Sequence, residues 1–203
     1  MKEKEHWENV FTTKAENEVS WYQKIPTTSL TLIENLQLSK DAKIIDVGGG
    51  DSYLIDSLLE KGYTNLFLLD ISEHAIERAK KRLGEKACKV TFIVSKNIAL
   101  DIDEKFELWH DRASFHFLTA KVDIELYSKV VSKYVTDNGQ VVIGTFSEKG
   151  PKKCSGLEIT QYTAETMRKV FENDFELVSS FEEDHQTPFD TTQNFIFCTF
   201  NKK

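Results

Sequence analysis

The sequence predicts an α/β fold built on one twisted sheet, because strand-like and helix-like segments alternate along most of the chain. Between residues 41 and 146, short apolar runs of strand length alternate with segments whose apolar residues recur at helical spacing. Near the C-terminus, two more apolar runs have only a loop between them, too short for a crossover helix, so they should pair antiparallel. At 203 residues, the chain is long enough to form a single domain over residues 1–203.

Seven strands are expected, five of them parallel and the last two an antiparallel pair at the sheet edge, with helices on both faces. The expected parallel strands are Lys43–Val47, Asn65–Asp70, Val90–Val94, Phe106–His110 and Gln140–Phe146. The expected antiparallel strands are Phe175–Phe181 and Thr192–Phe200.

The helices between the strands are recognised by their apolar faces and by the residues at their ends. The first stops at Gly62, and the second can be capped by Ser72. The third is expected to run to Val135 and to end in a tight turn at residues 137–139 before the fifth strand. A short helix over Ala164–Phe171 precedes the antiparallel pair.

The segment before the sheet, residues 1–40, is expected to be helical and to lie over the mouth of the site as a lid. It is rich in aromatic residues, including Trp7, Phe11, Trp21 and Tyr22. Nothing in the sheet requires two large rings at Trp21 and Tyr22, so we expect these two residues to form part of a lid over the cofactor and the acceptor.

Composition and charge exclude several classes of function. A net charge of −7 would repel a phosphate backbone, and no dense Lys/Arg cluster offsets it, so nucleic acid is not an expected partner. No apolar run reaches the ~18 residues of a membrane span, and the charged residues 1–6 do not resemble a secretory signal. The three cysteines are dispersed and form no CxxC pair, which favours a cytoplasmic protein without a structural zinc site. The sequence does not predict the oligomeric state.

A glycine-rich turn at residues 48–50 follows the first strand directly. Glycines permit positive φ and a close approach of ligand to backbone, and open α/β sheets bind ligands at this end of the strands. The dinucleotide fingerprint would need a further glycine where Tyr53 stands, so a nicotinamide-dependent oxidoreductase is the less favoured alternative. Asp46, just before the glycines, would repel a pyrophosphate and attract a cation, as in the sulfonium and ammonium groups of S-adenosylmethionine (SAM).

The second strand ends at Asp70, 22 residues after Gly48. An acid at about 20 residues from the glycines meets the ribose hydroxyls in this architecture. The alternative for Asp70 is helix capping beside Ser72. Ile71 would offer an apolar surface to an adenine ring.

These motifs resemble those of a known family. Asp46-x-Gly48-x-Gly50, the acid Asp70 and the closing antiparallel pair resemble the class I SAM-dependent methyltransferases, which have a Rossmann-like fold, over almost the whole chain. The segments His6-Trp7, Ser20-Trp21-Tyr22, Val47–Gly50 and Trp109–Leu118 resemble a bacterial methyltransferase group. The Trp-Tyr element and Asp70-Ile71-Ser72 are also similar to the eukaryotic lysine methyltransferases that act on elongation factor 1A and on citrate synthase.

The resemblance implies SAM as cofactor, S-adenosylhomocysteine as product and a protein lysine as acceptor, whereas Arg112 and a small site under a lid would equally suit a carboxylated metabolite. A non-catalytic SAM-binding module is a further alternative. Lys96 stands where many family members carry an acid that contacts adenine, so the Asn97 side chain and the Ile98 backbone are expected to make that contact instead. The expected cofactor-binding residues are Trp21, Tyr22, Asp46, Gly48, Gly49, Gly50, Asp70, Ile71, Asn97, Ile98, Asp111 and Arg112.

The expected catalytic residues follow from the end of the fourth strand, since the reacting atom of the acceptor lies near there in this fold. His110 or His116 could act as general base, Asp111 could stabilise a cationic amine, and Arg112 could bind a carboxylate. Alternatively, this cluster only holds the backbone or the cofactor. His110, Asp111 and His116 are not expected to bind a metal, because nothing else in the sequence supplies ligand spacing.

Overall fold

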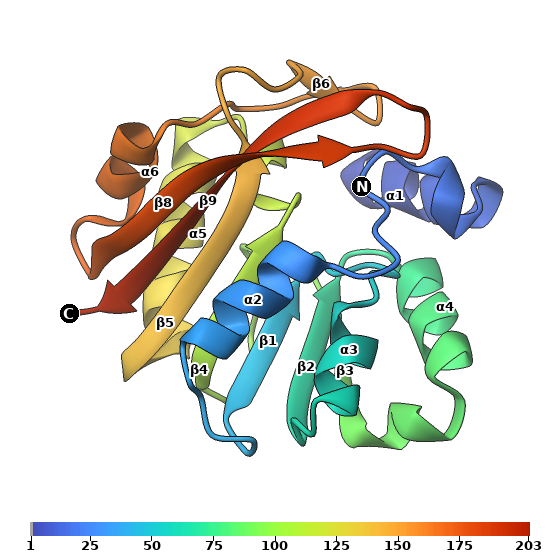
Figure 1. Cartoon of the computed structure of the whole chain (residues 1–203), viewed down its shortest axis with the longest axis horizontal. Coiled ribbons are helices and arrows are strands. Elements are labelled where there is room, and N and C mark those ends of the chain that lie inside the picture. Colours follow the sequence, from blue (N-terminus) through green and yellow to red (C-terminus); the bar gives the residue numbers. More distant parts are fainter. Residues whose placement is uncertain (1) are drawn as a thin grey trace.

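The computed structural model describes residues 2–203, which form a seven-stranded sheet in the order β3-β2-β1-β4-β5-β9-β8 and a small sheet of β6 and β7 (Figure 1). The strands are β1 (Lys43–Val47), β2 (Asn65–Asp70), β3 (Val90–Val94), β4 (Phe106–Arg112), β5 (Val135–Phe146), β6 (Lys153–Cys154), β7 (Leu157–Glu158), β8 (Phe175–Gln186) and β9 (Thr192–Lys202). The α-helices are α1 (Lys2–Thr13), α2 (Thr27–Asn35), α3 (Leu54–Glu60), α4 (Glu73–Leu83), α5 (Lys121–Tyr134) and α6 (Ala164–Phe171). Strands β1 to β5 are parallel and β8 and β9 are antiparallel, which confirms the predicted fold class.

Helices cover both faces of the sheet, and consecutive strand residues point to opposite faces. Ile44 packs in the core formed with α2, α3 and α4, whereas its neighbour Ile45 packs in the core formed with α5 and α6. In Figure 1, α2 and α3 lie in front of the sheet and α5 and α6 behind it. Burial on both faces explains why the central strands read as continuous apolar runs.

The connection between α5 and β5 differs from the prediction. We expected helix to Val135 and a tight turn at residues 137–139, but α5 ends at Tyr134 and β5 begins at once with Val135. Val135 is fully buried, has extended backbone (φ −85°, ψ 136°) and pairs with Phe106. The next paired residue is Gln140, opposite Leu108, so residues 136–139 form an irregularity within the strand.

Four strands (β4, β5, β8 and β9) are longer than predicted, and added residues of β4 and β8 line cavities. Strand β4 continues two residues past His110 to Arg112. The β8–β9 hairpin pairs up to Gln186 and Thr192, which leaves a short loop closed by a hydrogen bond from Thr187 N to Thr191 O (2.8 Å). Among residues 2–203, no helix has both the length and the apolar character needed to cross a membrane.

Candidate functional site

A cavity lies at the carboxyl ends of β1, β2 and β4, with α1 forming part of its wall. Most of the predicted site residues line it, which is expected because the carboxyl ends of parallel strands meet at one edge of the sheet. The predicted residues in its wall are Trp21, Tyr22, Asp46, Gly48, Gly49, Gly50, Asp70, Ile71, Asn97, His110 and Arg112. In the described chain, Ile98, Asp111 and His116 lie outside that wall.

The glycine-rich turn needs its glycines for conformation and for space. Gly48 and Gly50 have positive φ values of 64° and 54°, which favour glycine. The Gly48 N–H donates to Leu69 O at 2.7 Å, which fixes the turn against β2. A Cβ atom on Gly48 would overlap the Ser114 side chain, and one on Gly50 would lie 2.9 Å from the Phe11 ring. The turn is therefore tightly enclosed by the loop after β4 and by α1.

Asp46 takes part in a buried chain of three polar side chains. Its Oδ1 lies 2.7 Å from His110 Nδ1, and His110 Nε2 lies 2.9 Å from Ser29 Oγ. Asp46 and His110 are each 2% exposed and Ser29 is 1% exposed. Asp46 Oδ2 has no hydrogen-bond partner within residues 2–203, and a side chain on Gly49 would collide with it. His110 therefore orients Asp46, and one carboxylate oxygen is left for a ligand.

Asp70 lies at the end of β2 and is not the N-cap of α4, a position that Ser72 takes. The Ser72 N–H donates to Asp70 Oδ1 at 2.8 Å. Burial raises the pKa of Asp70 to about 7. The backbone N–H groups of Ser72 and Gly50 lower this pKa, and the charges of Asp51 and Asp46 raise it. The carboxyl group would gain from additional donors, such as the hydroxyls of a ribose.

The loop after β3 contributes Asn97 but not Ile98. Asn97 Nδ2 donates to Ser114 Oγ at 3.3 Å, and the residue lines the cavity. Ile98 instead packs against the core on the α5 side. Lys96, at the position where many family members have an acid, forms an ion pair with Glu3 of α1 (2.8 Å). Lys96 therefore contacts α1, and Ile98, which was predicted to contact adenine through its backbone, lies outside the cavity wall in the described chain.

Asp111 was predicted to face the acceptor and the cofactor, and the structure corrects this. It is fully buried, and the Tyr127 hydroxyl donates to its Oδ2 at 2.6 Å. The backbone N–H groups of Ser114 and Phe115 donate to its Oδ1 at 3.1 and 3.0 Å. Asp111 thus holds the loop after β4, on the opposite side of the strand from the cavity.

His116 was predicted as an alternative general base, and its surroundings exclude that role. It is fully buried and stacked on Phe146, with ring centroids 4.5 Å apart. Within the described residues, neither ring nitrogen has a hydrogen-bond partner. Burial, together with the charge of Arg112, lowers the pKa of His116 to about 3. A ring this hard to protonate is a poor proton acceptor at neutral pH.

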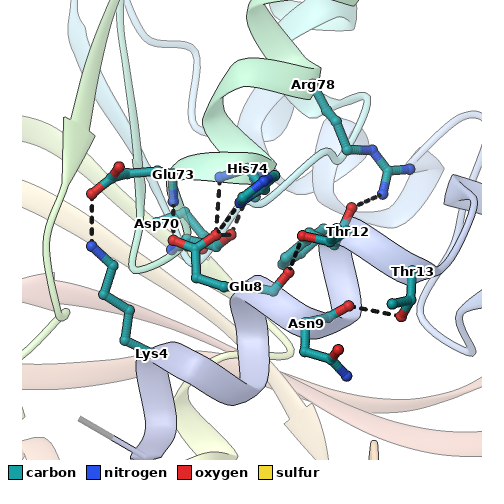
Figure 2. Close-up of polar contacts among 12 residues, drawn as sticks. Lys4, Glu8, Asn9, Thr12, Thr13, Asp70, Glu73, His74 and Arg78 are labelled. Atoms are coloured by element: carbon teal, nitrogen blue, oxygen red, sulfur yellow. Dashed lines mark hydrogen bonds and ion pairs between the residues drawn. The ribbon is translucent and has the colours of Figure 1, made fainter.

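The helix α1 is fixed to the start of α4 by Glu8 (Figure 2). The Glu8 carboxylate accepts from Ser72 Oγ and Glu73 N, both at 2.8 Å, and lies 2.7 Å from His74 Nδ1. Burial acts to raise the pKa of Glu8, but these hydrogen bonds have the larger combined effect and lower the pKa to about 2. Lys4 adds an ion pair to Glu73 at 2.7 Å. A carboxylate at a helix N-terminus complements the helix dipole, so this contact stabilises the packing of α1 against α4.

Aromatic rings of residues 1–40 pack against one another and against Phe117 and Tyr53 in the cavity wall. Trp7 contacts Trp21 and Phe117 edge to face, with centroids 5.8 and 4.9 Å apart. Tyr22 contacts Tyr53 in the same way at 6.3 Å. All five residues line the cavity. Such walls exclude water from whatever is bound beneath them.

The donor set fits the cofactor expected from the sequence. The free oxygen of Asp46 suits a cation, Asp70 suits hydroxyl donors, and the glycine turn leaves no side chains in the way of a ligand. Across the described residues, no group of three His, Cys, Asp or Glu side chains is placed to hold a metal ion.

The chain is similar to several known proteins. Over 142 residues it is 26% identical to the mouse (Mus musculus) eEF1A lysine and N-terminal methyltransferase, a match that covers 68% of this chain. The matched part is 20% of the mouse protein, so the chain spans about a fifth of that relative's length.

Solved structures described as methyltransferases share the fold of this chain. A SAM-dependent methyltransferase from Anabaena variabilis superposes with a TM-score of 0.78 and 15% identity, covering 98% of this chain and 93% of that one. The 1,6-didemethyltoxoflavin-N1-methyltransferase of Burkholderia thailandensis was solved with bound 1,6-didemethyltoxoflavin and S-adenosylhomocysteine. It superposes with a TM-score of 0.70 and 18% identity, covering 100% of this chain and 84% of that one. The family described as "Methyltransferase domain" matches residues 38–194, which is most of the chain. The chain therefore belongs to the methyltransferase domain family.

Proposed function

We propose that the chain, a SAM-dependent methyltransferase, transfers the methyl group to a small-molecule acceptor bound beneath the lid. The observation that carries this proposal is the aromatic enclosure made by Trp7, Trp21 and Phe117 over the cavity. An enclosed apolar pocket suits a small ligand that can be surrounded, as small-molecule sites usually do. The three cysteine thiols, none of them in a disulfide within residues 2–203, support a cytoplasmic location.

We assign the cofactor's parts to the residues that match them chemically. Asp46 would hold the ammonium group, Asp70 the ribose hydroxyls, and Ile71 with Asn97 the adenine. When bound, SAM supplies an electrophilic methyl group. The residues of this chain orient the two reactants and exclude water, and such positioning can supply much of the rate enhancement.

The acceptor is proposed to react as a nucleophile that needs no protein base. His110 has both ring nitrogens engaged, by Asp46 and Ser29, and His116 is buried away from the cavity. The proposed mechanism therefore rests on proximity and orientation rather than on proton abstraction.

A protein lysine is the second candidate acceptor. The similarity to the mouse eEF1A lysine and N-terminal methyltransferase favours it. The exposed acidic residues Glu182, Glu183 and Asp184 of β8 could attract a basic protein surface.

Labelling of a cell lysate with tritiated SAM tests these two candidates. After incubation with the enzyme, the lysate is separated into protein and small-molecule fractions. We expect enzyme-dependent label in the small-molecule fraction. Label confined to protein would support the second candidate, and binding of S-adenosylhomocysteine without any labelling would indicate a non-catalytic SAM-binding module.

The affinity for SAM is expected to rise with pH because of Asp70. If ribose hydroxyls donate to the ionised carboxylate, binding requires loss of the proton from a group whose pKa burial raises to about 7. The affinity should therefore fall by about tenfold from pH 8 to pH 6 and level off above pH 8. Asp70→Asn should bind SAM roughly 30- to 100-fold more weakly, with most of this pH dependence gone. Calorimetry across this pH range measures both effects, and a wild-type affinity independent of pH would contradict the assignment.

A further inference from the structure

Arg112 at the end of β4 is a cation without an anionic partner. Its Nη1 donates to the Trp21 carbonyl oxygen at 3.0 Å, and its guanidinium lies over the Phe195 ring, 5.1 Å from the centroid. No carboxylate oxygen in the described sequence lies within 4.0 Å of its nitrogens. Several of its N–H donors are therefore left for a ligand.

The surroundings of Arg112 favour an anion beside it. Burial lowers the pKa of Arg112 to about 10, although the charges of Glu183 and Asp46 act in the opposite direction. The guanidinium is only partly accessible to solvent and has no carboxylate beside it, which carries a cost in free energy. An anion that accepts two parallel hydrogen bonds from its planar fork would offset that cost.

Arg112 lies between two cavities. It lines the cofactor cavity and also a second cavity of about 430 Å³, formed by residues 22–25, the end of β8 with the following loop, and β9. A volume of this order is within the range of small-molecule sites. Tyr22, Phe195 and Phe197 give the second cavity an aromatic wall beside the guanidinium.

Other charged groups of the second cavity are already held by neighbours. The Thr28 hydroxyl donates to Glu183 at 2.6 Å, and Asn194 Nδ2 donates to Asp184 at 2.7 Å. His185 Nε2 lies 2.8 Å from the Ser20 carbonyl oxygen, to which it donates. Lys24 is the other cation of this wall, and it is exposed to solvent. The half-buried guanidinium of Arg112 is thus the cation at the junction with the cofactor cavity.

We propose that the methyl acceptor enters through this second cavity and carries a carboxylate that Arg112 binds. This assignment rests on the proposed function, and it names the class of acceptor: a small, preferably aromatic, carboxylic acid. A lysine ammonium would meet the like charge of Arg112 in the same place, so this site disfavours a protein lysine as acceptor.

The test uses simple probes and binding as the readout. The enzyme is saturated with S-adenosylhomocysteine and titrated with phenylacetate, its neutral analogue phenylacetamide, and Nα-acetyl-lysine methyl ester. Calorimetry and the fluorescence of Trp7 and Trp21 report binding. We expect phenylacetate to bind at least about tenfold more tightly than phenylacetamide. Arg112→Gln should remove that preference, and Arg112→Lys should keep only part of it. Lys105→Gln, at the other end of β4, removes the same charge and should leave the preference unchanged.

Three results would overturn the proposal. The first is equal binding of phenylacetate and phenylacetamide to the wild-type complex, a comparison that needs no variant. The second is tighter binding of the lysine ester than of phenylacetate. The third is that Arg112→Gln weakens S-adenosylhomocysteine but not 5′-methylthioadenosine, which lacks the amino-acid part, because Arg112 would then hold the cofactor's carboxylate. Failure of S-adenosylhomocysteine to bind the wild-type protein would instead contradict the proposed function itself.

Discussion

Replacing Asp46 by Asn is expected to weaken SAM binding by roughly 100-fold, or about 3 kcal/mol, because a charge-assisted contact is lost. The amide oxygen can still accept from His110 Nδ1, which lies 2.7 Å from Asp46 Oδ1. The amide nitrogen would then replace Asp46 Oδ2, the oxygen without a partner in residues 2–203. A donor would face the ammonium group where an acceptor had been. The fold should survive, since the shape of the side chain is almost unchanged.

The specificity of this effect is checked with a ligand that lacks the ammonium group. Dissociation constants for SAM and for 5′-methylthioadenosine are measured by calorimetry on the wild type, on Asp46→Asn and on Asp101→Asn. Asp101 is an exposed carboxylate in the loop after β3 and serves as the matched control. We expect a large change only for SAM with Asp46→Asn. Equal weakening of both ligands would show that Asp46 merely supports the glycine turn.

The parallel part of the fold could be predicted because burial leaves a simple pattern in the sequence. Residues such as Ile44 and Ile45 face opposite cores, so the strand has no polar face and appears as an apolar run. The start of β5 could not be predicted in the same way. Residues 137–139 have the composition of a turn, but pairing of Val135 with Phe106 extends the strand around them. Tertiary pairing overrode local turn propensity there.

Strand alternation explains which site predictions the structure corrects. Asp46 pairs with His110, and both lie on the side of α2, where Ser29 contacts His110. The next residue, Asp111, must point to the other face, where the Tyr127 hydroxyl of α5 reaches it. Arg112 then returns to the side of the cavity. Side chains alternate between the two faces along a strand. If β4 had been predicted to continue past His110, this alternation would have placed Asp111 on the opposite face from His110 and Arg112.

Ser29 and Glu8 illustrate what the sequence could not reveal. Ser29 and His110 form a contact although they are 81 positions apart in the sequence, and Glu8 and His74 do so at a separation of 66 positions. Neither residue belongs to a recognisable motif, and each acquires its role only when a helix docks on a distant element. Within residues 2–40, α1 and α2 agree with the predicted helices, whereas Trp21 and Tyr22 lie in a non-helical segment between them. The contacts that dock α1 on α4 depend on tertiary structure.

Removal of residues 1–24 is expected to abolish methyl transfer while leaving a folded protein that binds SAM more weakly. The deletion removes Trp7, Phe11, Trp21 and Tyr22 from the cavity wall, so water would reach the reacting groups and the acceptor would lose its enclosure. The sheet and its two main cores contain none of these four rings among their buried members. Circular dichroism and calorimetry with S-adenosylhomocysteine measure folding and cofactor binding, and turnover is measured on the acceptor found by labelling.

A point variant separates closure of the lid from the simple presence of its rings. Glu8→Gln keeps every aromatic side chain. It removes the negative charge of the carboxylate that contacts Ser72, Glu73 and His74 at the start of α4 (Figure 2). We expect kcat/KM to fall by roughly 10-fold, since about 1–2 kcal/mol of lid stabilisation is lost. Thr13→Val on the same helix is the matched control, because the Thr13 hydroxyl donates to Asn9 O within α1. Full activity of the truncated protein on its acceptor would refute the role of the lid. Loss of activity in the truncated protein, with Glu8→Gln as active as Thr13→Val, would show that the rings act without the Glu8 contact.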